Sequence, residues 1–310
     1  MPPTAIGSYI FPLRFFGVPH PDHADAATEI VKDIQIGEHL VHVTRGGGLF
    51  VTRPEGLATD ELFAFNEAIE ISLNRLICEF ALAANLISEP MSPVHFWVAQ
   101  LSKGHIDIRG AAGGRESYYE RSIGPSTLLN GSDWWTSWTP VDESAVDQVA
   151  PLNFSTTISS ISESAPRFVA SAYSHYSRAH MAEAIIDAFV VIEQIVDHYW
   201  SQHISQVPLK RRERLKDTRL YTASSRIEVL ETTGVIDSAQ STHFHNARGH
   251  RNNVAHRGAV GPDSAKESMS ALKAALELLC GDEVTQPQTS KSVMGVKTTR
   301  NRASHGAANH

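Results

Sequence analysis

The hydrophobic pattern changes once along the chain, and this change limits the folds that the chain can adopt. From Pro166 to Cys280, apolar residues recur at steps of three and four, the spacing of one buried helix face. Earlier residues form short strand-like runs and one clear helical stretch. A chain of 310 residues is long enough for two domains. We therefore predict an α+β fold with four parts: an N-terminal α+β domain of unknown role at 1–140, a Ser-rich connector at 141–164, a helical bundle at 165–281 and a disordered tail at 282–310.

The N-terminal part combines strand candidates with a helix. Four runs have a strand-like composition: 40–44, 49–52, 96–101 and 106–109. The first two flank the glycines at 46–48, which predicts a hairpin. Thr59 precedes two acidic residues and caps a predicted helix that ends before Pro90.

Two further features of this part invite a functional interpretation. The glycine-rich run 110–115 lacks the Lys-Ser/Thr pair with which a phosphate loop reaches phosphates and magnesium, so it predicts a flexible turn. Trp134, Trp135 and Trp138 crowd into a short segment. These rings either stack on bases or dock a partner, or they seal the join between the two domains.

The overall charge and the cysteines limit the partners and the compartment. A net charge of -7 excludes a surface that binds nucleic acid indiscriminately, so contact with RNA needs a local basic patch. Cys78 and Cys280 lie in apolar helical patterns, which indicates buried thiols in a reducing cytoplasm. No signal peptide is visible, and charges interrupt the apolar runs before membrane-spanning length. We predict a soluble cytoplasmic protein with no membrane partner.

The stretch RGHRNNVAHRG, at 248–258, concentrates the polar chemistry of the helical part. A helix is predicted to open at Asp237, which with Gln240 resembles a capping box, and to stop at Gly258, a residue suited to a left-handed cap. One stripe of this helix faces the core, and Arg251 interrupts it. The stripe consists of Phe244, Ala247, Arg251 and Val254.

Three polar side chains are expected to gather at the edge of this buried face. Asn252 and His256 stand four residues apart, on the stripe beside that of Arg251. We predict that the guanidinium, the carboxamide and the imidazole form a compact cluster. Positions 251 and 256 differ by about 140° around an ideal helix, so one copy makes only a loose site, which a second copy across a dimer would close.

An Arg-Asn pair followed after three residues by His resembles the R-x(4-6)-H signature of the HEPN superfamily, whose arginine is typically followed by Asn, Asp or His. The match is Arg251-Asn252-Asn253-Val254-Ala255-His256, and the trailing Arg257-Gly258 is also similar to the family. Upstream, IIDAFVVIEQIVDHYW, which contains Glu193, resembles the long first helix of the Apea-like branch. The resemblance covers about residues 165–281. It implies a bundle of four or five helices that dimerises so that both motifs face one cleft, and in catalytic members metal-independent cleavage of RNA; some members are not catalytic.

Cleaving RNA without a metal requires a base for the 2′-OH proton, an acid for the leaving 5′-oxygen and cationic donors for the phosphate. His256 is accessible in both protonation states near neutrality, and Arg251 offers a forked, permanently charged donor. Asn252 would hold the imidazole or donate to phosphate. Glu193 either orients Arg251 or His256, or it is a solvated helix residue. The alternative for the cluster is that Arg251 and Asn252 cap the last carbonyls of the helix and His256 is a packed terminal residue.

A basic run follows Pro208 and contains few acidic residues. Such a run is usually a solvated face, but in a chain of negative net charge it is also the surface that suits a phosphate chain. The residues predicted to bind RNA are Lys210, Arg211, Arg212, Arg214, Arg219, Arg248 and Arg257.

The histidines near the motif suggest zinc, but their spacing disfavours it. They are His243, His245, His250 and His256. Residues at i and i+2 point apart on a helix, no pair has the i, i+4 spacing, and no cysteine is near. We therefore predict no metal and no cofactor.

Together these features predict a cytoplasmic endoribonuclease that forms a homodimer through its C-terminal helical domain. The resemblance alone implies a toxin or phage-defence effector, with a neutralising or triggering protein as a further partner. The alternative is a non-catalytic HEPN module for dimerisation, nucleotide sensing or RNA binding, in which the N-terminal domain recognises a partner.

Overall fold

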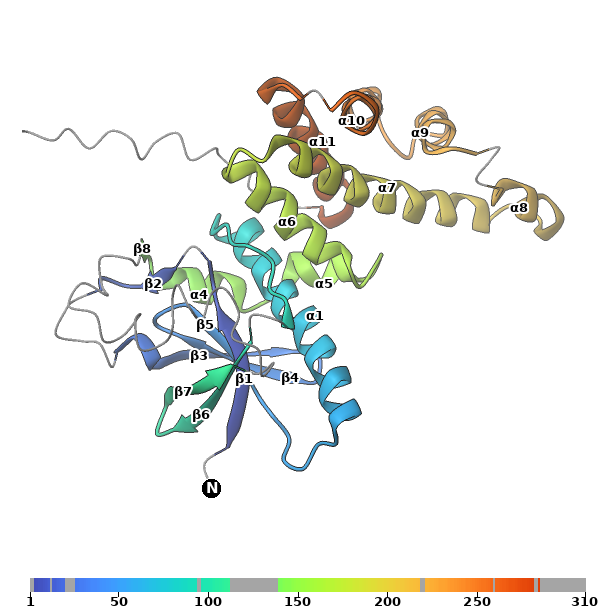
Figure 1. Cartoon of the computed structure of the whole chain (residues 1–310). Coiled ribbons are helices and arrows are strands. Elements are labelled where there is room, and N and C mark those ends of the chain that lie inside the picture. Colours follow the sequence, from blue (N-terminus) through green and yellow to red (C-terminus); the bar gives the residue numbers. More distant parts are fainter. Residues whose placement is uncertain are drawn as a thin grey trace, which may run out of the picture.

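The computed structural model combines a β-sheet with an array of helices, and the predicted α+β class is confirmed (Figure 1). It describes residues 3–11, 13–19, 26–93, 96–111, 139–217, 221–258, 260–281 and 284. Several sequence expectations lie outside the described residues: those for Trp134, Trp135, Trp138 and Arg219, for most of the glycine-rich run 110–115, and for the tail 282–310 apart from Val284.

The elements are numbered in chain order. The strands are β1 (Thr4–Tyr9), β2 (Arg14–Phe16), β3 (Ile30–Ile36), β4 (His39–Thr44), β5 (Gly48–Thr52), β6 (Trp97–Ser102), β7 (His105–Ala111) and β8 (Thr139–Val141). The helices are α1 (Thr59–Ala83), α4 (Ser144–Val149), α5 (Asn153–Ser159), α6 (Ala165–Ser177), α7 (Met181–Ser205), α8 (Leu209–Leu215), α9 (Ala223–Thr232), α10 (Ser238–Arg257) and α11 (Pro262–Cys280).

The main sheet has six antiparallel strands in the order β3-β4-β5-β1-β6-β7. The predicted hairpin is confirmed as β4 and β5, which pair Val43 with Leu49. Between the central strands β1 and β5 the backbones approach closely at Gly7, where a Cβ would lie 1.9 Å from the carbonyl oxygen of Leu49. Glycine is therefore required at this position.

Helix α1 contributes to two hydrophobic cores. Ile69, Leu73 and Phe80 pack into the core between this helix and the sheet. Cys78 and Leu82 belong instead to the core of the helical array, and all five side chains are at most 1% exposed. Burial also raises the pKa of the Cys78 thiol. Because one helix serves both cores, the sheet and the helical array are joined by packing as well as by the chain.

The segment 141–164, expected as a Ser-rich connector, folds into the helices α4 and α5, which pack against α1. Its serines are interspersed with apolar side chains that are buried, among them Val146, Val149 and Ile158. Burial of these three residues against α1 explains why the segment is helical in spite of its composition.

Glu79 of α1 is 1% exposed and acts as a cap for α5. Its Oε2 accepts the backbone N–H of Ser155 at 2.7 Å, and its Oε1 accepts that of Phe154 at 3.3 Å. These amides lie in the first turn of α5, where no earlier carbonyl is available to them. Loss of water around the carboxyl raises the pKa of Glu79 above its ordinary value, even though both hydrogen bonds lower it.

In the helical array, α6, α10 and α11 pack against the long helix α7, and α9 and α8 adjoin its C-terminal half (Figure 1). The core contains Ile185, Ile192 and Ile195 of α7 together with Val284, which lies beyond the end of α11. None of the helices in the described ranges has the length and apolar character needed to cross a membrane. The domain boundaries expected from the sequence stay a prediction.

We predict that Glu79→Gln changes the pH dependence of stability. Because the pKa is raised in the folded chain, the unfolded chain releases this proton first. The wild type therefore loses stability relative to Glu79→Gln as the pH rises from 4.5, the ordinary pKa of glutamate, through the folded pKa. Urea unfolding of both proteins at a series of pH values measures the difference.

The matched control for this experiment is Glu163→Gln, because Glu163 is exposed. This variant should follow the pH dependence of the wild type. If Glu79→Gln does the same, the raised pKa of Glu79 is contradicted.

Candidate functional site

The helix that carries the motif, α10, has the two ends that the sequence predicted. Asp237 Oδ1 accepts the N–H of Gln240 at 2.8 Å, and Gln240 Oε1 accepts the N–H of Asp237 at 3.0 Å, which completes the capping box. At the other end Gly258 has φ 63° and its N–H donates to the carbonyl of Val254 at 3.1 Å. The motif therefore occupies the last two turns of a helix with both ends fixed.

Burial and one ion pair set the orientation of α10. Phe244 and Ala247 are fully buried in the helical core, and Val254 packs partly against it. On the side toward α11, His250 Nε2 lies 2.8 Å from Glu267 Oε2. These contacts hold the helix against α7 and α11 and decide which of its side chains face outward.

Two histidines of α10 face carboxylates on neighbouring helices. His250 meets Glu267 of α11, and His245 Nε2 lies 3.1 Å from Glu228 Oε1 of α9, although this second pair lacks the alignment of a hydrogen bond. Among the described residues, no three His, Cys, Asp or Glu side chains are grouped so that they could hold a metal ion.

Arg251 does not lie in the core-facing stripe that the sequence predicted; it is exposed. Its guanidinium carbon stands 5.8 Å from the ring centroid of Phe189 on α7, and its Nη1 donates to Asn252 Oδ1 at 3.2 Å. A buried guanidinium without a carboxylate partner would be costly, whereas contact with a ring face at an exposed site stabilises by about 0.5–1 kcal/mol. The side chain is thus held in place with its charge open to solvent.

The compact three-residue cluster is therefore only partly formed. Arg251 and Asn252 are in contact, but His256 is exposed and makes no hydrogen bond or ion pair with any described residue. Glu193 is partly buried and likewise has no such partner in the described part of the chain, so within one chain it does not orient Arg251 or His256. Both ionisable groups of the motif are open to a ligand or to another chain.

The residues predicted to bind RNA fall on two separate surfaces. Lys210, Arg211 and Arg214 are exposed on α8, whereas Arg257 is exposed at the end of α10 and Arg248 is partly buried in the middle of α10. The C-terminal end of α7, next to α8, lies sixteen residues beyond Phe189, about 24 Å along the helix at 1.5 Å per residue. The basic run is therefore not adjacent to the motif.

Arg212 differs from the other members of the basic run because it points inward. Its Nη2 donates to the backbone carbonyls of Ser205 and Val207, the latter at 3.2 Å. These carbonyls lie at the C-terminal end of α7, where no helical N–H remains to bond them. Through Nη2, Arg212 thus caps the end of α7.

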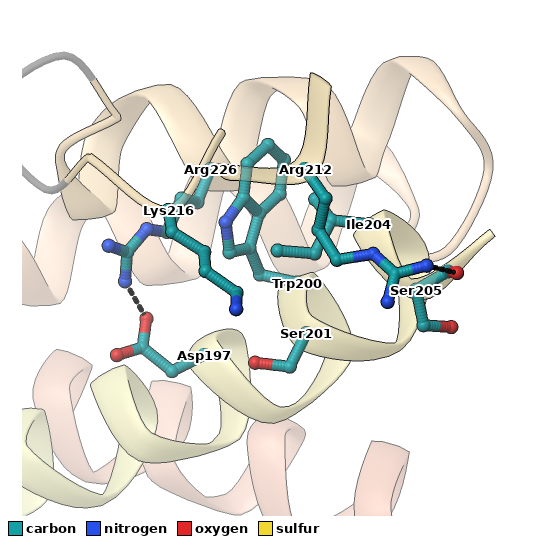
Figure 2. A pocket seen from close by; sticks show the side chains of 8 residues that line it. All are labelled: Asp197, Trp200, Ser201, Ile204, Ser205, Arg212, Lys216 and Arg226. Atoms are coloured by element: carbon teal, nitrogen blue, oxygen red, sulfur yellow. Dashed lines mark hydrogen bonds and ion pairs between the residues drawn. The ribbon is translucent and has the colours of Figure 1, made fainter. Parts of the chain in front are cut away.

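Sequence reasoning did not find a pocket of about 360 Å³ between α7, α8 and α9 (Figure 2). Its lining residues are Asp197, Trp200, Ser201, Ile204, Ser205, Arg212, Lys216 and Arg226. Two of its cations, Arg212 and Lys216, belong to the basic run that the sequence shows after Pro208. Nothing in the sequence indicated that Arg226, which is distant along the chain, packs beside Trp200 to close the pocket.

Comparison of the chain with protein-family models, with curated proteins and with solved structures finds no significant match. The functional interpretation therefore rests on the residues of the site itself.

We predict that substitution by alanine has opposite effects on stability at two glycines, one at the end of α10 and one inside it. Gly258→Ala should destabilise the protein by about 1 kcal/mol, because alanine is strained at positive φ. Gly249→Ala, inside α10, should stabilise it by about 0.5–1 kcal/mol, because alanine favours the helix. A Cβ meets no atom within 4 Å at either position, so packing does not obscure the comparison.

Urea unfolding of the two variants and the wild type tests this prediction. Equal effects of the two substitutions would show that Gly258 does not act as a left-handed cap.

Proposed function

We propose that this protein is a metal-independent endoribonuclease of the HEPN type, which cleaves RNA by attack of the 2′-OH on the adjacent phosphate. The observation that carries the proposal is the state of the motif. Arg251 is oriented by Phe189 and Asn252, yet no carboxylate of the described residues neutralises it, and His256 stands exposed on the same capped helix end. A cation and an imidazole are thus both exposed near the end of one helix.

The proposed reaction follows from these groups. A base removes the 2′-OH proton, the 2′-oxygen bonds to phosphorus, and the bond to the 5′-oxygen breaks as an acid protonates it. The products are a 2′,3′-cyclic phosphate and a 5′-hydroxyl. His256 is the proton-transfer group, Arg251 donates to the phosphate oxygens as their charge rises, and Asn252 holds the guanidinium in position.

We further propose that the active unit is a homodimer, because positions 251 and 256 lie about 140° apart around an ideal helix, so Arg251 of one copy and His256 of the other would together form the site. Beside the motif, Ile186 of α7 is 40% exposed one turn from Phe189, and such an apolar side chain suits contact with a second copy. Glu193 lies one turn beyond Phe189 and has no described partner. Across a two-fold axis this carboxylate would offset the repulsion between two Arg251 side chains.

The exposed cations of α8 would contact RNA away from the scissile phosphate. Lys210, Arg211 and Arg214 form a local basic surface on a chain whose net charge is -7. The family resemblance implies a role as a toxin or defence effector in the cytoplasm, and we include this role in the proposal. A neutralising or triggering protein would control the activity.

The second candidate function is a non-catalytic HEPN module that senses a nucleotide. The specific observation in its favour is the cationic pocket at the other end of α7. Substitution of the motif separates the two candidates, because only the first requires Arg251 and His256 for cleavage.

We predict that Arg251→Ala and His256→Ala each lower the rate of RNA cleavage about a hundredfold or more, because each removes a group that acts on the transition state. The assay uses mixed RNA with EDTA present. The control is His243→Ala, since His243 is exposed on the same helix and outside the motif; it should cleave at the wild-type rate. Wild-type protein that leaves RNA intact, or variants that keep full activity, would contradict the proposal.

The shared site predicts complementation between inactive subunits. A mixture of Arg251→Ala and His256→Ala chains should recover part of the activity that both homodimers lack, because one of the two composite sites in each heterodimer keeps both groups. Light scattering measures the oligomer at the assay concentration. A monomer at that concentration, or a dimeric mixture without recovered activity, would contradict division of roles between subunits.

A further inference from the structure

The pocket between α7, α8 and α9 has an excess of positive charge. Among the described residues, Arg212, Lys216 and Arg226 line it together with one carboxylate, that of Asp197, which leaves two positive charges in excess. Figure 2 shows Arg226 paired with Asp197 on one side and Arg212 beside Ser205 on the other, with Lys216 reaching into the space between them. The pocket therefore attracts an anion rather than a neutral or cationic group.

The buried part of the pocket carries donors that lack acceptors. Trp200 is 4% exposed and Arg226 is 7% exposed. Trp200 Nε1, Arg226 Nε and Arg212 Nε are shielded from solvent, and none has a hydrogen-bond partner in the described part of the chain. Buried N–H groups are costly to leave unpaired, so a ligand that brings oxygen acceptors would satisfy what the chain leaves open.

Trp200 offers its edge to a ligand and not its face. Tyr221 stacks on the ring with centroids 5.5 Å apart, and His203 stacks on it at 5.9 Å. Two rings thus already stack on Trp200, whereas its N–H edge lies among the cationic side chains in Figure 2. The recognised part of the ligand is thus an oxyanion.

Lys216 is placed to complete such a site. Its side chain is 57% exposed, and its described ionic partner is Glu213, at 3.2 Å and one turn earlier. Exposed pairs of this kind are weak, so the ammonium is free to turn onto a ligand.

We propose that this pocket binds the terminal phosphate of a nucleotide or of a 5′-phosphorylated RNA end. A phosphate monoester has a charge near -2 and three free oxygens at neutral pH, which matches the excess positive charge of the pocket and offers acceptors to its unpaired N–H groups. A phosphodiester inside a strand carries one charge and two free oxygens, and a water molecule carries no charge. Both therefore match the charge of the pocket less well than a phosphate monoester does. The site is separate from the motif, since Trp200 lies about 16 Å from Phe189 along α7.

The test measures binding to the full chain by titration calorimetry. All proteins carry Arg251→Ala, which removes the phosphate donor of the motif and the proposed cleavage. A negative result for the pocket can therefore be told apart from a failure of the proposed function. The probes are inorganic phosphate, AMP, adenosine, and one short oligoribonucleotide with and without a 5′-phosphate. Binding of AMP but not adenosine is expected. The two oligonucleotides show whether an RNA end is also accepted, and inorganic phosphate shows whether the anion alone suffices.

Two substitutions locate the binding. Trp200→Phe keeps the stacked ring and removes the N–H, and Lys216→Met keeps the length of the side chain and removes its charge. Each should weaken AMP binding about tenfold, the effect of losing one charged or buried hydrogen bond. Lys266→Met, which changes an exposed lysine on α11 outside the pocket, is the control and should leave binding unchanged.

Three results would overturn the proposal: no binding of AMP, equal binding of AMP and adenosine, or unchanged AMP affinity in Lys216→Met. Lys216 is exposed, so this variant stays informative even if Trp200→Phe is unstable. If the 5′-phosphorylated RNA binds and its 5′-hydroxyl form does not, the RNA end is a ligand of the site; if neither binds while AMP does, the site is specific for small nucleotides.

Discussion

The arrangement of the whole structure depends on burial of both sides of α1. Leu73 and Phe80 face the sheet, while Cys78 and Leu82, on the same turns, enter the core of the helical array. A helix that has apolar residues on all sides must be packed against other elements on all sides. The sheet covers one side, α5 and α6 cover the other, and Glu79 supplies the cap that α5 lacks. The motif helix α10 is then placed through α6 and α7.

The long helix α7 separates two regions of different chemistry. Near its start, Phe189 supports Arg251, and His256 stands exposed nearby on α10. Near its end, Trp200 and Arg226 form a pocket with unpaired donors. Both regions suit phosphate, the first at an open surface and the second in a pocket. We propose that the first acts on RNA and that the second recognises a terminal phosphate.

The ends of the motif helix could be predicted from the sequence. Asp237 with Gln240 and the terminal Gly258 fixed the bounds of α10, because capping depends on residues a few positions apart. The exposure of Arg251 was not predictable from the sequence. Periodicity gives the direction of a side chain around its own helix, but it does not show how far along that helix the neighbouring helix continues to cover the face. The inward position of Arg212 was not predictable for a related reason: a run of basic residues does not reveal which of them will meet the carbonyls at the end of another helix. The pocket required the tertiary position of Arg226.

We propose that the motif cleaves RNA through the 2′-OH. The most direct measurement identifies the ends of the products when wild-type protein is incubated, in EDTA, with an oligoribonucleotide and with its 2′-deoxy counterpart. The account predicts fragments with 2′,3′-cyclic phosphate and 5′-hydroxyl ends from the RNA, and no cleavage of the deoxy strand. Fragments with 3′-hydroxyl and 5′-phosphate ends, or cleavage of the deoxy strand, would contradict it.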